Sequence, residues 1–397
     1  MDAHADAIRT VQRRHVAQID VLRVVTMFAV IGVHTIMFTQ PVDGIGSNGL
    51  LVLLHVSRLV FFFVTAFVLF YSYGERDVSV LRFWRRRFPA ILVPYLAWTV
   101  IYWQLNRAFP WGGYPDSWPQ ALGQLGQDLG LGWFHLYFLL VTMQLYVAFP
   151  LVSWLIRRTR GRHVQLLLAS AAVQVAWTTA MQYAWAWLPG PVHALFQSAQ
   201  VGLWSYQFFV LVGALAAVHL HEVREWIRAH SRLAPGLAVG SLVAGEGVYL
   251  LNVRLGQQPA SAQGVFQPAT ILLFAGVVLS LWLLAERLLR DRGAHGSFQR
   301  GLRWAGETSF GIYLSHMVVL QLVLLDPVRQ ALGLDGLPLV QTGIATWLVA
   351  ATGTTALAVA LRYTELSRLL TGRARLPLPR RSGPAAVPES QPARRAA

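Results

Sequence analysis

The apolar stretch 18–40 carries the side chains best suited to chemistry. Asp20 and Arg23 stand near its start, and His34 follows Arg23 by eleven residues. In a helix, eleven residues make about three turns, so Arg23 and His34 are predicted to project from nearly the same face, about 16 Å apart along the axis. A guanidinium binds anions, and a neutral imidazole accepts protons near neutral pH. The pattern indicates an anion-binding group at one end of a helix and a general base deep inside it.

Other ionisable side chains are few within the apolar stretches, and each has two interpretations. Arg58 follows His55 in the second stretch, where a structural ion pair or snorkelling competes with a role in substrate binding. His135 and His316 fall at or near the outer ends of their stretches. A hydrogen-bonded packing role is the commoner one for an isolated histidine there, so both are ranked as supporting candidates.

A basic cluster precedes the third apolar stretch, in the segment RFWRRRFPAILVPY that contains Arg86 and Arg87. These arginines suit either anchoring at the membrane surface or phosphate binding through guanidinium forks. The chain has no cysteine and no lysine, which excludes disulfides, thiol nucleophiles and lysine chemistry. It also has no GxSxG, P-loop or HExxH motif, and its histidines are too scattered to predict a metal site.

The composition is that of a membrane protein. Hydrophobic residues make up 55% of the chain and charged residues 13%, with a mean hydropathy of +0.46. We predict an all-α, polytopic transmembrane helix bundle, because ten apolar runs approach the length of about 20 residues that a span needs. The predicted spans are 18–40, 50–73, 88–106, 134–156, 164–188, 200–220, 234–252, 267–288, 308–325 and 340–361.

The positions of the arginines predict the orientation. If the N-terminus is cytoplasmic, 28 of the 33 arginines fall in cytoplasmic segments and three in the opposite loops. This asymmetry follows the positive-inside rule and places both ends of the chain in the cytoplasm. The net charge of +15 lies in short clusters between apolar runs, so it indicates a membrane surface and not nucleic acid.

Three regions are expected. Residues 1–17 form a cytoplasmic N-terminal segment, residues 18–362 the ten-helix domain, and residues 363–397 a largely disordered cytoplasmic tail rich in Arg and Pro. The long connection at 107–133, rich in Gly, Pro and Trp, is expected on the outer face, either as a cover over the bundle or as an ordinary loop.

Several segments together resemble the membrane acyltransferase-3 family, whose members O-acylate carbohydrates and related envelope molecules. The first stretch is similar to the family's pattern of an arginine, ten intervening residues and a histidine, which fits Arg23 and His34. SRLVFFFVTAFVLF, RRRFPAILVPYL, HLYFLLVTMQLYVAFPL and ETSFGIYLSHMVV resemble four further family segments in the same order. The resemblance covers about 18–362.

The chain departs from the family pattern at three places. Thr65 and Ala66 stand where Ser and Gly are usual, and Tyr137 takes the place of a tryptophan. The family often has a second arginine three positions after the one matched by Arg87, and this chain has Ala90 there. Arg82 or Arg85 would have to supply that contact.

The resemblance implies a cell-membrane O-acyltransferase that moves an acyl group from cytoplasmic acyl-CoA, with acetyl-CoA the expected donor, to a hydroxyl of a carbohydrate or glycolipid. His34 would be the general base, and Asp20 and Arg23 would organise the donor's entrance. Arg86 and Arg87 would face the CoA phosphates together with Arg23. Arg58 would bind the acceptor or stabilise the oxyanion. His135, Tyr137 and His316 would support the site, and no metal is implied.

Alternatives stay open on sequence grounds. A transporter or flippase for an anionic or lipid-linked substrate would also place Arg23 and His34 along a pathway. A non-catalytic membrane component that binds a glycolipid is a further possibility. Direct transfer and a covalent acyl-histidine relay are not separable by sequence, and neither the acceptor nor the oligomeric state can be predicted.

Overall fold

The computed structural model describes residues 15–74, 79–109, 113, 117–184, 187, 198–292 and 296–377. Within these residues every regular element is a helix, which confirms the all-α prediction. Residues 1–14, most of the predicted N-terminal segment, and residues 378–397 of the predicted tail lie outside the described residues.

Long helices alternate with short helical turns along the chain. In order they are α1 (Ala17–Thr39), α2 (Ile45–Tyr73), α3 (Val80–Arg87), α4 (Pro89–Ala108), α5 (Trp118–Leu131), η2 (Phe134–Leu136), α6 (Tyr137–Arg158), α7 (His163–Tyr183), η4 (Ala199–Val201), η5 (Leu203–Tyr206), α9 (Gln207–Val218), α10 (Leu220–Ala229), α11 (Leu233–Arg254), α12 (Pro259–Ala262), α13 (Thr270–Arg292), α14 (Gly296–Val323), α15 (Asp326–Ala331), η6 (Leu334–Gly336), α16 (Leu339–Leu361) and α17 (Ser367–Thr371).

Each predicted span overlaps a helix. Fewer than ten of the described helices are individually long and apolar enough to cross a membrane. Eight pass by length and composition among the described residues, or nine if the bent pair formed by α9 and α10 is one span. α14 is not among them. Its first half carries Arg300, Arg303 and Glu307. The fold is that of a multi-pass membrane protein; the number ten and the cytoplasmic placement of both ends stay predictions.

Two segments differ from the sequence expectation. The connection at 107–133 contains α5, which starts with Pro119 in its first turn and is not simply an extended loop. Residues 363–377 pack back onto the bundle through α17, where Leu370 is buried and its carbonyl accepts a hydrogen bond from Trp98 Nε1 at 2.9 Å. We refer to residues 363–377 as the C-terminal hook. Neither feature shows in the hydropathy because both elements are short.

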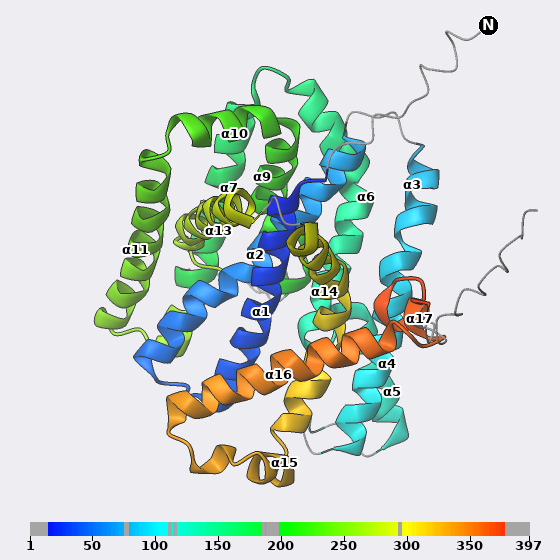
Figure 1. Ribbon diagram of the computed structural model, residues 1–397. Helices are drawn as coiled ribbons and strands as arrows, with labels where there is room; N and C mark the ends of the chain where they lie inside the picture. The colour runs from blue at the N-terminus through cyan, green and yellow to red at the C-terminus, as the bar shows by residue number, and fades with distance from the viewer. Residues whose placement is uncertain are drawn as a thin grey trace, which may run out of the picture.

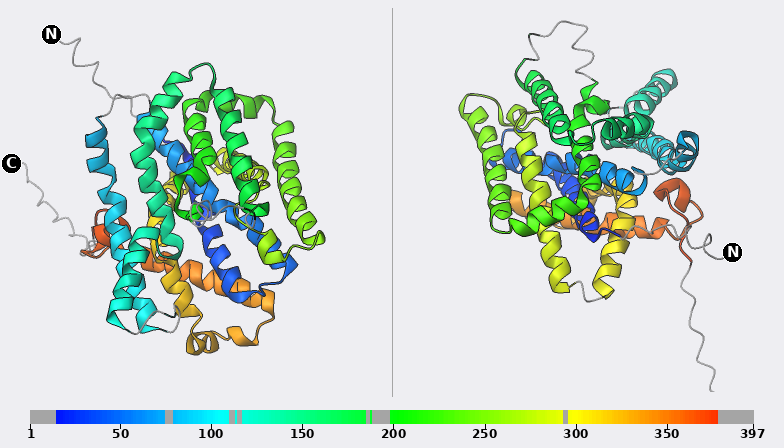
Figure 2. Two further views of the ribbon diagram at one scale, coloured as in Figure 1. Left: turned by 180° about the vertical axis from the view of Figure 1, so that it is seen from behind. Right: turned by 90° about the horizontal axis from the view of Figure 1, so that it is seen from above.

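Helix α1 runs through the middle of the molecule and packs against α2, α13, α14 and α16 (Figures 1 and 2). The helices do not form a parallel bundle, since α16 runs across the line of α1 in Figure 1. α13 and α14 project together from one side in the right-hand view of Figure 2. The central position of α1 explains why its polar residues meet side chains from several distant segments.

The phenylalanine-rich segment of α2 forms much of the core. Phe62, Phe63 and Phe67 are almost fully buried, and Phe63 packs edge-on against Phe274 of α13, with ring centroids 5.9 Å apart. α9 approaches α2 very closely, because a Cβ atom on Gly213 would lie 2.2 Å from the carbonyl oxygen of Phe63. Small residues at such contacts let two membrane helices approach to backbone contact.

We predict that Gly213→Ala lowers the free energy of unfolding by about 2 kcal/mol or more, because the new methyl group would meet backbone atoms of α2 that cannot rotate away. Thermal unfolding of the purified protein in detergent would measure this. Gly240→Ala on α11 is the matched control, since a Cβ there meets nothing within 4 Å. Equal melting temperatures for the two variants would contradict the α2–α9 contact.

Candidate active site

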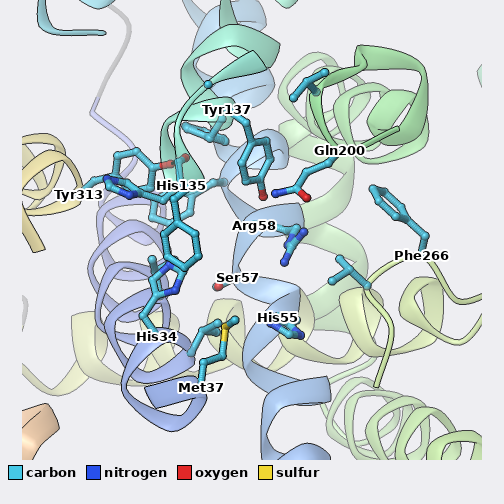
Figure 3. A pocket seen from close by; sticks show the side chains of 18 of the residues that line it. His34, Met37, His55, Ser57, Arg58, His135, Tyr137, Gln200, Phe266 and Tyr313 are labelled. Atoms are coloured by element: carbon cyan, nitrogen blue, oxygen red, sulfur yellow. The ribbon is translucent and has the colours of Figure 1, made fainter. Parts of the chain in front are cut away.

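A cavity of about 670 Å³ lies beside α1 and α2 and is the candidate site (Figure 3). Aromatic and aliphatic side chains make up much of its wall, including Met37, Phe61, Phe134 and Phe266. The polar side chains in its lining are His34, His55, Ser57, Arg58, His135, Tyr137, Ser198, Gln200, Gln263 and Tyr313. A mostly apolar cavity with a few converging polar groups is the usual form of a small-molecule site.

The cavity lies at the end of the molecule opposite the arginine-rich helix ends. His34 stands in the last two turns of α1, and three connecting segments also contribute to the wall, at 131–134, 198–201 and 263–266. The arginine clusters lie at the other ends of these helices, for example Arg157 and Arg158 at the end of α6. If the arginines mark the cytoplasmic side, the cavity faces the outer half of the membrane.

Three histidines from separate parts of the chain meet at this cavity. The rings of His34 and His316 are stacked with centroids 5.2 Å apart, and the rings of His135 and His316 are 4.6 Å apart. His34 and His135 are 6.4 Å apart. His34 and His135 face the cavity, whereas His316 is fully buried behind them. We call these three residues the histidine cluster.

A strained turn brings His135 into the cluster. Gly132 has a φ of +77°, and a Cβ atom on it would lie 2.5 Å from the Cα of Tyr137, so only glycine fits there. Phe134 has a φ of +43°, which is uncommon for a side-chain-bearing residue, and its ring lies 4.8 Å from that of His34. Strained backbone at a cavity wall is typical of functional sites.

Two hydrogen bonds hold the backbone around the histidine cluster in place. The Tyr313 hydroxyl donates to the carbonyl oxygen of His135, and the Tyr102 hydroxyl donates to the carbonyl oxygen of Leu314 at 2.7 Å. These two bonds tie α14 to η2 and to α4. Hydrogen bonds from tyrosine hydroxyls to backbone carbonyl oxygens therefore hold together elements that are far apart in the sequence.

The protonation pattern of His316 follows from its single partner. Its Nδ1 lies 2.7 Å from the carbonyl oxygen of Tyr313, which can only accept, so neutral His316 carries its proton on Nδ1. The Nε2 lone pair is buried and has no hydrogen-bond partner among the described residues. The same holds for both ring nitrogens of His135 and for the Nδ1 of His34. Unpaired buried nitrogens are costly, which favours a functional reason for the cluster.

Arg58 lies in the cavity between Tyr137 and Gln200 on one side and His55 on the other (Figure 3). Its guanidinium carbon is 5.9 Å from the centroid of the Tyr137 ring. No carboxylate among the described residues forms an ion pair with it. The structural ion pair that was considered for Arg58 from the sequence is thus not found among the described residues.

The predicted donor-binding residues lie away from the cavity. Asp20 is buried, accepts from His15 and is 3.8 Å from Arg23 Nη1. A Cβ atom on Gly306 of α14 would lie 2.9 Å from Asp20 Oδ1, so this carboxylate also sits against α14. Arg86 is exposed, and the guanidinium of Arg87 lies 5.0 Å from the ring centroid of Tyr73. The structure does not bring these residues to His34.

The C-terminal hook adds an arginine near Arg23 that the sequence did not single out. A Cβ atom on Gly372, which has a φ of +64°, would lie 2.7 Å from the carbonyl oxygen of Ala90. The next residue, Arg373, is close enough to Arg23, Glu307 and Arg362 to interact with them electrostatically. The guanidinium groups of Arg23 and Arg373 thus lie near one end of α1, with the Glu307 carboxylate also close to Arg373.

No group of three or more His, Cys, Asp or Glu side chains among the described residues is arranged to hold a metal ion. The histidine cluster does not count as such a group. Further cavity residues that the sequence did not single out are Phe134, Gln200 and Gln263, which lie in connections with no recognisable motif.

The fold and the site define a multi-pass membrane protein with a mostly apolar cavity in which several histidines converge. The family model described as acyltransferase domain, of the acyltransferase-3 type, matches residues 16–363. The chain belongs to this family and is a membrane acyltransferase, which confirms the resemblance. No curated protein and no solved structure gives a significant match.

We expect neutral His316 to show the Nδ1-protonated tautomer, because its only partner among the described residues is a carbonyl oxygen. Nitrogen-15 NMR of histidine-labelled protein in detergent would detect this as a signal that disappears in His316→Asn. An Nε2-protonated signal assigned to His316 would contradict the hydrogen bond to Tyr313. His221→Asn on the exposed face of α10 serves as the assignment control.

Proposed function

We propose that this acyltransferase moves an acyl group, acetyl in the simplest case, from cytoplasmic acyl-CoA to a hydroxyl of a carbohydrate or glycolipid, with His34 as the general base. The observation that carries this proposal is that His34 lines a cavity with a few converging polar groups and stacks on His316. We place the protein in the cytoplasmic membrane with the cavity facing outward.

The chemistry requires a base beside a bound hydroxyl. His34 would take the proton of the acceptor hydroxyl as its oxygen attacks the thioester carbonyl. The tetrahedral intermediate would then collapse with release of the CoA thiolate, which would take the proton held by His34. A positioned imidazole contributes about 10²–10⁴ in rate to such a step.

Arg58 is the candidate for stabilising negative charge. It is the cation that lines the cavity, and its guanidinium has no carboxylate partner among the described residues. A positive group near a developing oxyanion is most effective when water is excluded, as in this partly apolar cavity. Arg58 would either serve the oxyanion or bind the acceptor through hydrogen bonds.

The acceptor is inferred to be rich in hydroxyl groups. Ser57, Gln200 and Gln263 add hydrogen-bonding groups to the cavity wall, and Tyr137 adds a phenol. Side chains that both donate and accept are suited to a sugar, whose hydroxyl groups do the same. The connecting segments in the wall would give such an acceptor its path from the outer side.

The donor phosphates would bind at the opposite end of α1. Arg23 and Arg373 lie there. Arg86 and Arg87 are the last two residues of α3, just before α4. Because Arg23 and His34 are about 16 Å apart along the helix, the acyl group would have to travel along α1 to reach the base. The extended arm of CoA between its phosphates and its thioester suits this separation.

We predict that His34→Ala abolishes transfer from radiolabelled acetyl-CoA to membrane glycolipid extract, with a loss of at least about 10²-fold, because the acceptor hydroxyl loses its base. The assay uses purified protein in lipid nanodiscs, with thermal unfolding as a check on folding. His221→Ala, an exposed histidine on α10, is the control and should retain activity. Full activity in His34→Ala would exclude His34 as the base.

Arg373→Gln is expected to raise the KM for acyl-CoA by about fivefold to tenfold with little change in kcat, because one charge-assisted phosphate contact is lost. The matched control is Arg368→Gln, which removes one exposed charge from the same hook. Steady-state kinetics at saturating acceptor would measure both. Equal KM values would remove Arg373 from the donor site.

A further inference from the structure

A second cavity, of about 460 Å³, opens at the arginine-rich end of the molecule between α10, α11 and α13. It lies apart from the histidine cluster and shares none of the lining residues of that site. Ile227 and Arg228 of α10, Val239 of α11, and Leu283 and Arg287 of α13 line it. We call it the α10–α13 cavity.

The packing of α11 and α13 explains where this cavity begins. A Cβ atom on Gly276 would lie 2.9 Å from the carbonyl oxygen of Ala238, so the helices touch closely at that level. The cavity starts about one turn further along α13, at Ser280. The 86° bend between α9 and α10 sets α10 beside this opening, near the ends of α9 and α11 in Figure 1.

The lining is divided between charge and apolar surface. Arg228, Arg287 and Arg290 are exposed guanidinium groups that contribute to the lining, and none of them forms an ion pair with a described carboxylate. Among the described lining residues, Glu286 is the one carboxylate, and it accepts a hydrogen bond from Trp282 Nε1 at 3.0 Å. The cavity therefore has excess positive charge.

Most of the remaining lining is apolar, and Ser231 and Ser280 add two hydroxyl groups. Ile227, Val239, Leu283 and Leu284 contribute to it, together with Pro235 and Ala238. A free phosphate would gain nothing from this surface, whereas a molecule with a charged head and a hydrocarbon chain would use both parts. The arginines and the apolar wall together fit a molecule with an anionic head and a hydrocarbon chain.

We propose that the α10–α13 cavity binds an anionic phospholipid, with the phosphate at Arg228, Arg287 and Arg290 and part of an acyl chain against Leu283 and Val239. Basic pockets between helices on the cytoplasmic side are suited to anionic headgroups. The arginine-rich end is the side that the sequence places in the cytoplasm, where the leaflet carries anionic lipid.

Native mass spectrometry of the purified full chain with added phosphatidylglycerol tests this proposal. The double variant Arg287→Gln/Arg290→Gln should bind phosphatidylglycerol about tenfold more weakly than the unaltered chain. Its matched control is Arg157→Gln/Arg158→Gln, which removes two exposed charges at the end of α6 that line neither cavity. Equal losses in the two double variants would overturn the site.

Two further measurements identify the ligand class. Leu283→Trp keeps every arginine but fills the apolar part, so it should also weaken phosphatidylglycerol binding; unchanged affinity would show that no acyl chain enters. Phosphatidylcholine should bind less tightly, and inorganic phosphate or CoA should not displace the lipid. Displacement by either of them would overturn a lipid site in favour of a free-phosphate site.

Discussion

The hydrogen bond from the Tyr313 hydroxyl to the carbonyl oxygen of His135 is the contact on which the site depends. It joins α14 to the turn before α6 in a buried region where no bulk water competes for either group. Together with the bond from Tyr102 to Leu314, it determines how far His316 stands from His135 and His34. The tyrosines around the cluster thus stabilise it through the hydrogen bonds of their hydroxyl groups as well as through packing.

Much of the fold could be predicted because membrane helices are specified locally. An apolar run in hydrocarbon must satisfy its own backbone hydrogen bonds, and every predicted span overlaps a helix. The first half of α14 escaped prediction because Arg300, Arg303 and Glu307 interrupt the apolar signal. The bend after α9 and the C-terminal hook depend on packing, such as the contact of Trp98 with Leu370, and such contacts leave no local pattern.

The site was predictable only where one helix carries it. The spacing of Arg23 and His34 indicated an anion-binding group and a base on the same helix, and Arg58 was considered as a substrate contact because it is a charge within a span. The structure places Arg58 in the cavity lining, and its contact with a substrate stays a prediction. The convergence of His34 with His135 and His316 involves segments about one hundred residues or more apart, and no spacing rule reports such contacts. From the sequence, His135 and His316 were therefore expected only to support the site, whereas in the structure their rings lie beside that of His34. The family match supports the class of reaction, while the geometry supplies the candidates for its steps.

The cavity wall combines helices with connecting segments, and this affects how the range of acceptors can change between related proteins. The histidines are held by α1, α14 and a strained turn, whereas segments 198–201 and 263–266 of the wall come from connections between helices. Connections tolerate changes in length and sequence far better than buried helix contacts do. New acceptors could then be accommodated by exchanging these two segments while the groups proposed for chemistry stay in place, so that one helical frame would serve many substrates.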